Sequence, residues 1–142
     1  VVLRPDELPA VVDRGRYYAA IAALEEVGET ESAATAWRTA AARWPGDRTA
    51  LFGIANTDFA SGRLDEAARL LRHMLAADET FTAARNNLAL VLAHRGDFDA
   101  AEAEIETAIR LNSDPGLAAV LRDTANQIRQ MKSAGIGPEP GK

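Results

Sequence analysis

The side chains that could do chemistry in this sequence are two histidines, a few serines and several groups of carboxylates. His73 and His94 have no metal-ligand spacing between them, and a metal site typically needs three or four converging ligands. No serine stands in the strained turn that exposes a nucleophile. The acidic residues at 25–26 and 102–106 fit solvated helix faces better than acid–base pairs. We therefore predict no catalytic residue, no metal site and no cofactor, and so not an enzyme.

Composition narrows the class of protein further. The chain has 142 residues, a net charge of −5 and no cysteine. An acidic chain without a basic face is a poor binder of nucleic acid. No apolar run approaches the roughly 20 residues that span a bilayer. We expect a soluble bacterial protein of the cytoplasm or periplasm, and since it starts at Val1 we expect a mature form or an excised piece.

Three regularly spaced glycines reveal a repeat in the elements that position these side chains. Gly28, Gly62 and Gly96 are spaced 34 residues apart. A small residue, a large apolar residue and a further apolar residue follow each glycine at the same intervals: Ala33, Trp37 and Ala40; Ala67, Leu71 and Met74; Ala101, Ile105 and Ala108. Each glycine can end one helix in a left-handed conformation, and the small residue lets the next helix approach closely. The period predicts a repeated helix pair.

A period of 34 residues with this pattern resembles the tetratricopeptide repeat (TPR). The resemblance implies an all-α fold: a right-handed superhelical α-solenoid of three helix–turn–helix repeats with a C-terminal capping helix. We expect helices at about 14–27, 31–43, 48–61, 64–77, 82–95 and 98–111, and a seventh that begins at Asp114-Pro115. The predicted parts are a lead-in (1–13), repeats (about 14–47, 48–81 and 82–115), a capping helix (115–131, closing a domain of 14–131) and a disordered tail (132–142).

Two residues depart from the apolar pattern of the first helices. Arg85 stands where the family usually has a bulky apolar residue, and Asp58 where it has an aromatic. A buried carboxylate is costly unless it is paired. We expect Asp58 to tilt to solvent or to meet an arginine such as Arg69, with a ligand-facing acid as the alternative.

The resemblance also implies a binding surface, because the first helix of each pair lines the concave side of a stacked array. One stripe per helix should face it, and in the first helix this stripe is Tyr18, Ala22 and Glu25. The predicted peptide-binding groove comprises Tyr18, Phe52, Asn56, Phe59, Asn86, Asn87, Leu90 and His94. Amides can hold a peptide backbone and aromatic rings can form apolar pockets. The alternative is that the rings pack within the scaffold and the amides face water.

The groove composition predicts a protein-interaction scaffold that binds an extended, largely uncharged polypeptide segment. Asn56 and Asn87 resemble the asparagines of the clamps that hold chaperone tails, but Phe52 stands where such a clamp needs lysine. The partner is another polypeptide or an upstream domain of the same protein.

Two alternatives remain open. Leu3–Pro9 and Asn86–Ala89 look similar to repeat modules of bacterial papain-like cysteine peptidases, which implies a non-catalytic, substrate-recruiting or regulatory module at the C-terminus of a larger enzyme. The other is a homotypic assembly module. The oligomeric state is not predicted.

Overall fold

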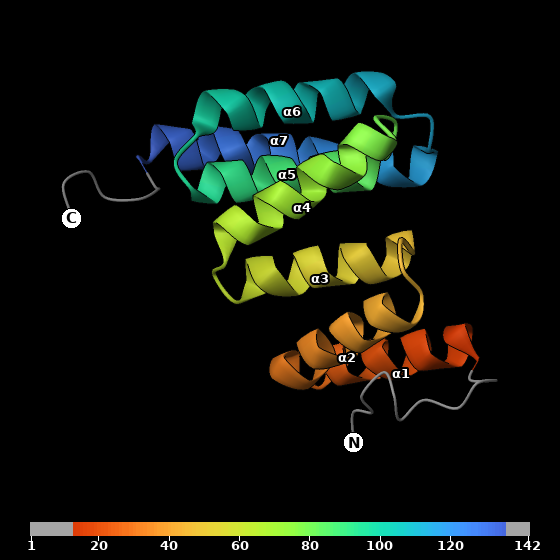
Figure 1. The fold of residues 1–142 in the computed structure, drawn as a ribbon. Coiled ribbons are helices and arrows are strands. Elements are labelled where there is room, and N and C mark those ends of the chain that lie inside the picture. Colours follow the sequence, from red (N-terminus) through yellow and green to blue (C-terminus); the bar gives the residue numbers. More distant parts are fainter. Residues whose placement is uncertain (1–12, 136–142) are drawn as a thin grey trace. The chain divides into compact units, whose positions relative to one another are not determined.

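The computed structural model describes residues 13–135, which form seven α-helices and no strand. The helices are α1 (Arg14–Glu26), α2 (Thr30–Arg43), α3 (Arg48–Ala60), α4 (Leu64–Ala77), α5 (Thr82–His94), α6 (Phe98–Leu111) and α7 (Pro115–Ser133). The chain divides into two compact units, residues 1–61 and 62–142, and each is described by itself. The first holds α1 to α3 and the second α4 to α7 (Figure 1).

The helix ends lie within one or two residues of the positions that the sequence predicts. The repeat-marking glycines have φ angles of +80°, +80° and +85° at positions 28, 62 and 96, a left-handed conformation that side chains with a Cβ avoid. At the start of α7 the Asp114 carboxylate accepts a hydrogen bond from the Gly116 amide at 2.8 Å, and Pro115 is the first helical residue. The predicted lead-in lies outside the described residues except for its last residue, Asp13, which caps α1.

The first unit has a core between α1, α2 and α3 that centres on one large side chain. Trp37 of α2 is 7% exposed, and its indole lies directly on Gly53 of α3. A Cβ atom built on Gly53 would come within 2.2 Å of Trp37 Cδ2, so the close approach of α3 to this indole depends on the missing side chain. Ile21 and Ala33 are buried in the same cluster.

The second unit builds its core around α5, which packs against α4, α6 and α7. The largest fully buried side chains of this unit come from all four of its helices: Leu71, Leu88, Val91, Leu92, Ile105, Leu121 and Ile128. Helix α7 packs on α5 and α6 and buries Leu121, Ile128 and Met131, which recur at helical spacing, while Leu117 is half-buried. This helix extends to Ser133, so the first two residues of the predicted tail are helical, and 136–142 lie outside the described residues.

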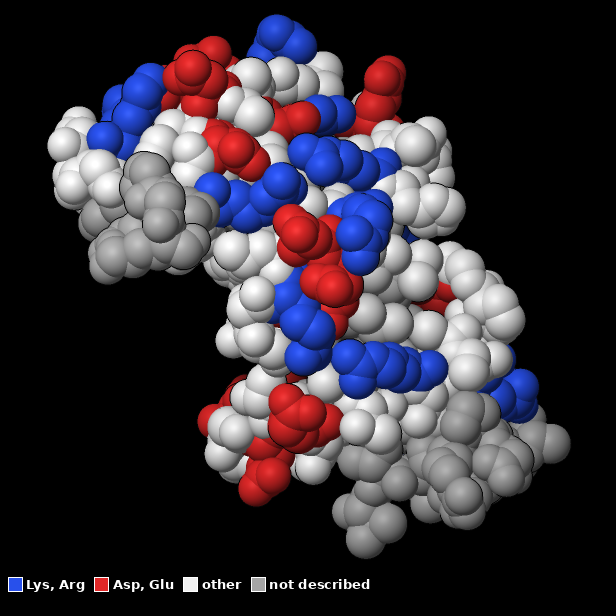
Figure 2. Space-filling model, turned by 60° about the vertical axis from the view of Figure 1, so that its left-hand side comes forward, with Lys and Arg blue, Asp and Glu red and all other residues white. Residues whose placement is uncertain are grey.

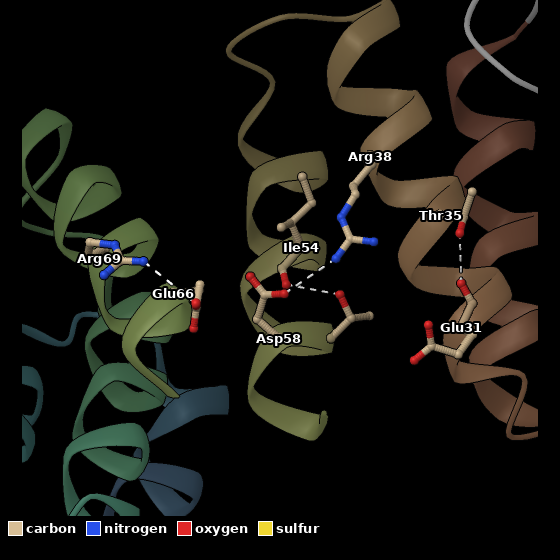
Figure 3. A network of polar contacts seen from close by, with 8 residues as sticks. Glu31, Thr35, Arg38, Ile54, Asp58, Glu66 and Arg69 are labelled. Carbon is tan, nitrogen blue, oxygen red and sulfur yellow. Dashed lines mark hydrogen bonds and ion pairs between the residues drawn. The ribbon is translucent and has the colours of Figure 1, made fainter. Parts of the chain in front are cut away.

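The two residues that break the apolar pattern are both neutralised by a partner on another helix. The half-buried Arg85 of α5 donates to the Glu104 carboxylate of α6 at 2.7 Å. The side chain of Asp58 does not point to solvent, and the residue is buried, with 7% of its surface exposed. It pairs with Arg38 of α2 at 3.7 Å, whereas the predicted Arg69 pairs with Glu66 in its own helix (Figure 3). Burial of Asp58 is tolerated because α2 brings a cation to it.

Candidate functional site

The predicted residues of the first unit gather on α3, beside a hollow. Phe52, Asn56 and Phe59 are each half-buried, and their spacing of four and three residues places them on one helix face. A pocket of about 270 Å³ opens beside Asn56. The last turn of α1, the start of α2 and the C-terminal half of α3 line it, through Glu25, Thr30, Asn56, Thr57 and Ala60.

The polar groups of this pocket are held by the scaffold beneath. The indole Nε1 of Trp37 donates a hydrogen bond of 2.7 Å to Oε1 of Glu25, so a buried ring of α2 fixes an exposed carboxylate of α1. The Thr57 hydroxyl donates to the Ile54 carbonyl at 3.0 Å. A ligand would therefore meet acceptors whose positions are already set, which reduces the entropy lost on binding.

Tyr18, in contrast, is built into the scaffold. Its ring lies 5.3 Å from that of Trp37 and 5.7 Å from that of Trp44, centroid to centroid. Its hydroxyl donates to the carboxylate of Asp47, the residue that precedes α3. Burial and this hydrogen bond raise the pKa of the Tyr18 phenol. The side chain ties α1 to α2 and to the residue before α3, which the spacing of residues along α1 does not indicate.

In the second unit, the predicted residues of α5 separate into buried and accessible ones. Asn86 is only 7% exposed; its Nδ2 donates to Asn87 Oδ1 at 3.1 Å, and its own Oδ1 is buried without a partner in the described residues. The face of α5 that carries Asn86 is covered, because α5 packs against three helices. Asn86 was predicted to lie in an open groove, and in the structure it is buried. Asn87 and Leu90 are half-buried, and His94 is exposed at the end of the helix.

The sequence pattern places Glu25 on the first-helix stripe. It does not predict that Thr30 and Thr57 line the same pocket or that Trp37 bonds Glu25. The stripe rule follows one helix at a time, whereas the pocket is assembled from three. Within residues 13–135, no three acidic or histidine side chains converge as a metal site would require. None of the described helices combines the length and the hydropathy needed to cross a membrane.

Comparisons with known proteins agree with this architecture. Two sequence models of the tetratricopeptide repeat match residues 18–80 and 58–123, which together cover most of the chain. The chain belongs to the tetratricopeptide repeat family. Proteins of this family are typically non-catalytic scaffolds for protein interaction, and the repeats support the general role of protein interaction for this chain.

Solved structures give the same fold. The crystal structure of the P58(IPK) TPR domain matches with a TM-score of 0.69 and 20% identity over 86% of this chain, which spans 34% of that chain. MamA from Desulfovibrio magneticus RS-1 (residues 41 to the end) matches with a TM-score of 0.63 and 16% identity, over 86% of this chain and 73% of that one. A search of curated proteins gives no match. The weak similarity to cysteine peptidase modules is not supported by these comparisons.

Proposed function

We propose that this domain binds an extended, largely uncharged polypeptide segment through the α3 surface of its first unit. The observation that carries the proposal is the pocket beside Asn56, which is lined by the end of α1, the start of α2 and the C-terminal half of α3. Membership of the family indicates the general function, protein interaction. We propose this pocket as the site at which the partner binds. The segment comes from another protein or from another domain of the same protein.

The chemistry of the α3 surface fits a peptide backbone and apolar side chains. The Asn56 amide can both donate and accept, as one peptide group requires. Phe52 and Phe59 flank it at the i−4 and i+3 positions, and both residues are half-buried. Aromatic rings next to fixed polar groups are the usual anchors of protein interfaces. None of the lysines or arginines within residues 13–135 lines this pocket, so a segment that depends on an acidic group is not favoured.

The second unit offers its own contacts, which we include in the proposal. Asn87, Leu90 and His94 retain accessible surface on α5. Asn86 contributes indirectly, because its amide orients Asn87 through the 3.1 Å hydrogen bond. This bond limits the orientations in which the Asn87 amide can meet a ligand.

The proposal is tested by selecting ligands and then removing their contacts. A random peptide display library is selected on the 142-residue chain, and the enriched peptide is titrated calorimetrically. Asn56→Ala should weaken binding by about 0.5–1.5 kcal/mol, the net value of one hydrogen bond. Phe59→Ala should cost about 2 kcal/mol if the ring is an anchor.

Asn126→Ala is the matched control, because Asn126 is exposed on α7. Circular dichroism should show that all variants keep the wild-type helix content. Wild-type affinity in both α3 variants, with a loss in the control, would place the binding site elsewhere and refute the proposal.

A further inference from the structure

Four glutamates flank the turn between α1 and α2, and no basic partner for them lies within residues 13–135. Glu25, Glu26, Glu29 and Glu31 are all exposed. Among the described residues, none of them forms an ion pair with lysine or arginine. In Figure 2, acidic side chains gather over this turn in the lower part of the view. All four charges belong to one short stretch of the chain, residues 25–31.

This lack of ion pairs differs from the pattern in the other described residues. Acidic side chains elsewhere are commonly paired across helices, as Glu104 is with Arg85 at 2.7 Å and Glu102 with Lys132 at 2.8 Å. The four carboxylates of this turn therefore differ from these acids in having no ion-pair partner among the described residues.

Local helix stability does not explain the two acids of α1. Glu25 and Glu26 are the last two residues of α1, and no basic residue stands in that turn. Negative charge at a helix C-terminus opposes the helix dipole and is destabilising. Glu29 and Glu31 differ, because they lie at the N-terminus of α2, where the dipole favours them. Glu25 therefore costs helix stability, and Trp37 nevertheless holds its carboxylate in one position. A role in contacting a ligand accounts for this arrangement better than a role in stabilising α1.

One of these four carboxylates lies in a concave site, the pocket beside Asn56. Glu25 is one of its lining residues. The bond from Trp37 occupies Oε1, and Oε2 accepts no bond from the described residues. Thr30 and Asn56 add further oxygen atoms to the same lining. Since no three carboxylates converge as a metal site needs in the described part of the chain, an extended organic cation fits better than a metal ion.

We infer that the pocket between Glu25 and Asn56 receives one basic side chain, arginine or lysine, of an otherwise uncharged polypeptide segment. This rests on the proposed function and adds a specificity-determining position to it. A guanidinium or ammonium group donates to Oε2 of Glu25, and Glu26, Glu29 and Glu31 attract it without direct contact. The planar guanidinium, with five donors, makes better use of several fixed acceptors than the ammonium does.

The test uses a short acetylated and amidated peptide of alanine, asparagine and leucine with one central arginine. Its copies carry citrulline, which has the same shape without the charge, or lysine. Each is titrated into the ¹⁵N-labelled full chain. We expect the assigned indole N–H signal of Trp37 to shift with the arginine peptide, because that proton is bonded to Glu25. The arginine peptide should bind at least about tenfold more tightly than the citrulline peptide, as a charge-assisted hydrogen bond implies.

Glu25→Gln is the decisive variant, since glutamine keeps an oxygen that can accept from Trp37 but lacks the charge. It should abolish the preference for arginine over citrulline. Glu106→Gln, which removes an exposed acid of α6, should leave that preference unchanged. If the arginine and citrulline peptides bind equally and both shift the Trp37 signal, the cation site is refuted while polypeptide binding at the pocket stands. If the arginine peptide does not bind, or binds without shifting that signal, the inference fails, and the library selection decides the proposed function independently.

Discussion

Gly53→Ala is the substitution for which local and tertiary effects predict opposite signs. Gly53 lies in the middle of α3, where alanine is a better helix former by about 1 kcal/mol. A Cβ atom at this position, however, would lie 2.2 Å from Trp37 Cδ2 and 2.3 Å from Cε2. Real Cβ atoms do not approach carbon so closely, so either the indole or α3 must move.

The indole is poorly placed to move. It is 7% exposed, packs 5.3 Å from the Tyr18 ring and donates to Glu25 at 2.7 Å. Overpacking a filled core typically costs about 1–3 kcal/mol, and a clash with a constrained ring belongs at the upper end. Subtracting the helix-propensity gain of about 1 kcal/mol leaves a net loss of about 2 kcal/mol.

Urea unfolding followed by tryptophan fluorescence measures this loss. Both tryptophans, Trp37 and Trp44, lie in the first unit, so the signal reports on the unit that contains the clash. The variant should unfold at a lower urea concentration. In a Trp37→Leu background the same substitution should cost much less, because the ring that it strikes is gone, and the double-mutant cycle isolates this coupling.

A Gly53→Ala variant as stable as wild type, or more stable, would show that helix propensity outweighs the contact. That result would refute the packing of Trp37 on α3. Equal cost of the substitution in both backgrounds would also contradict it, since the loss would then arise from something other than the indole.

Two further predictions concern the cores of the two units. Ala67 is fully buried in the second unit, so Ala67→Leu should lower the stability of that unit by about 1–3 kcal/mol, and an unchanged thermal midpoint would mean that the repeat register is wrong. The pKa of Tyr18 is raised by burial and by Asp47. The contribution of this phenol to the free energy of unfolding is therefore complete below the ordinary phenol pKa of about 10, and it is lost as the pH rises through the higher pKa of the folded state. Urea midpoints measured above pH 10 should therefore fall with pH in wild type and fall less in Tyr18→Phe; identical slopes would show that Tyr18 is not the group responsible.

The sequence by itself determined the helices and their boundaries, because the signals for these are local. Three glycines at a 34-residue period stop three helices with φ near +80°. Asp114 followed by Pro115 starts the seventh helix through a bond to an amide two residues away. Each of these signals acts within one turn of chain, so it can be read without knowing what the helix packs against. The repeated spacing of small and large residues then identifies the family.

Only the tertiary structure decided what the polar and aromatic side chains of these helices do. Asp58 meets Arg38, Tyr18 bonds Asp47, and Trp37 holds Glu25. Each of these pairs joins one helix to another helix or, for Asp47, to the residue that precedes one. Its geometry depends on the rotation and the axial register with which the helices pack, which in turn depend on contacts such as the bare backbone of Gly53. A stripe along a single helix contains no information about those variables. For that reason Asn86 was expected in an open groove and is buried, and the pocket formed by three helices beside Asn56 could not be derived from the sequence alone.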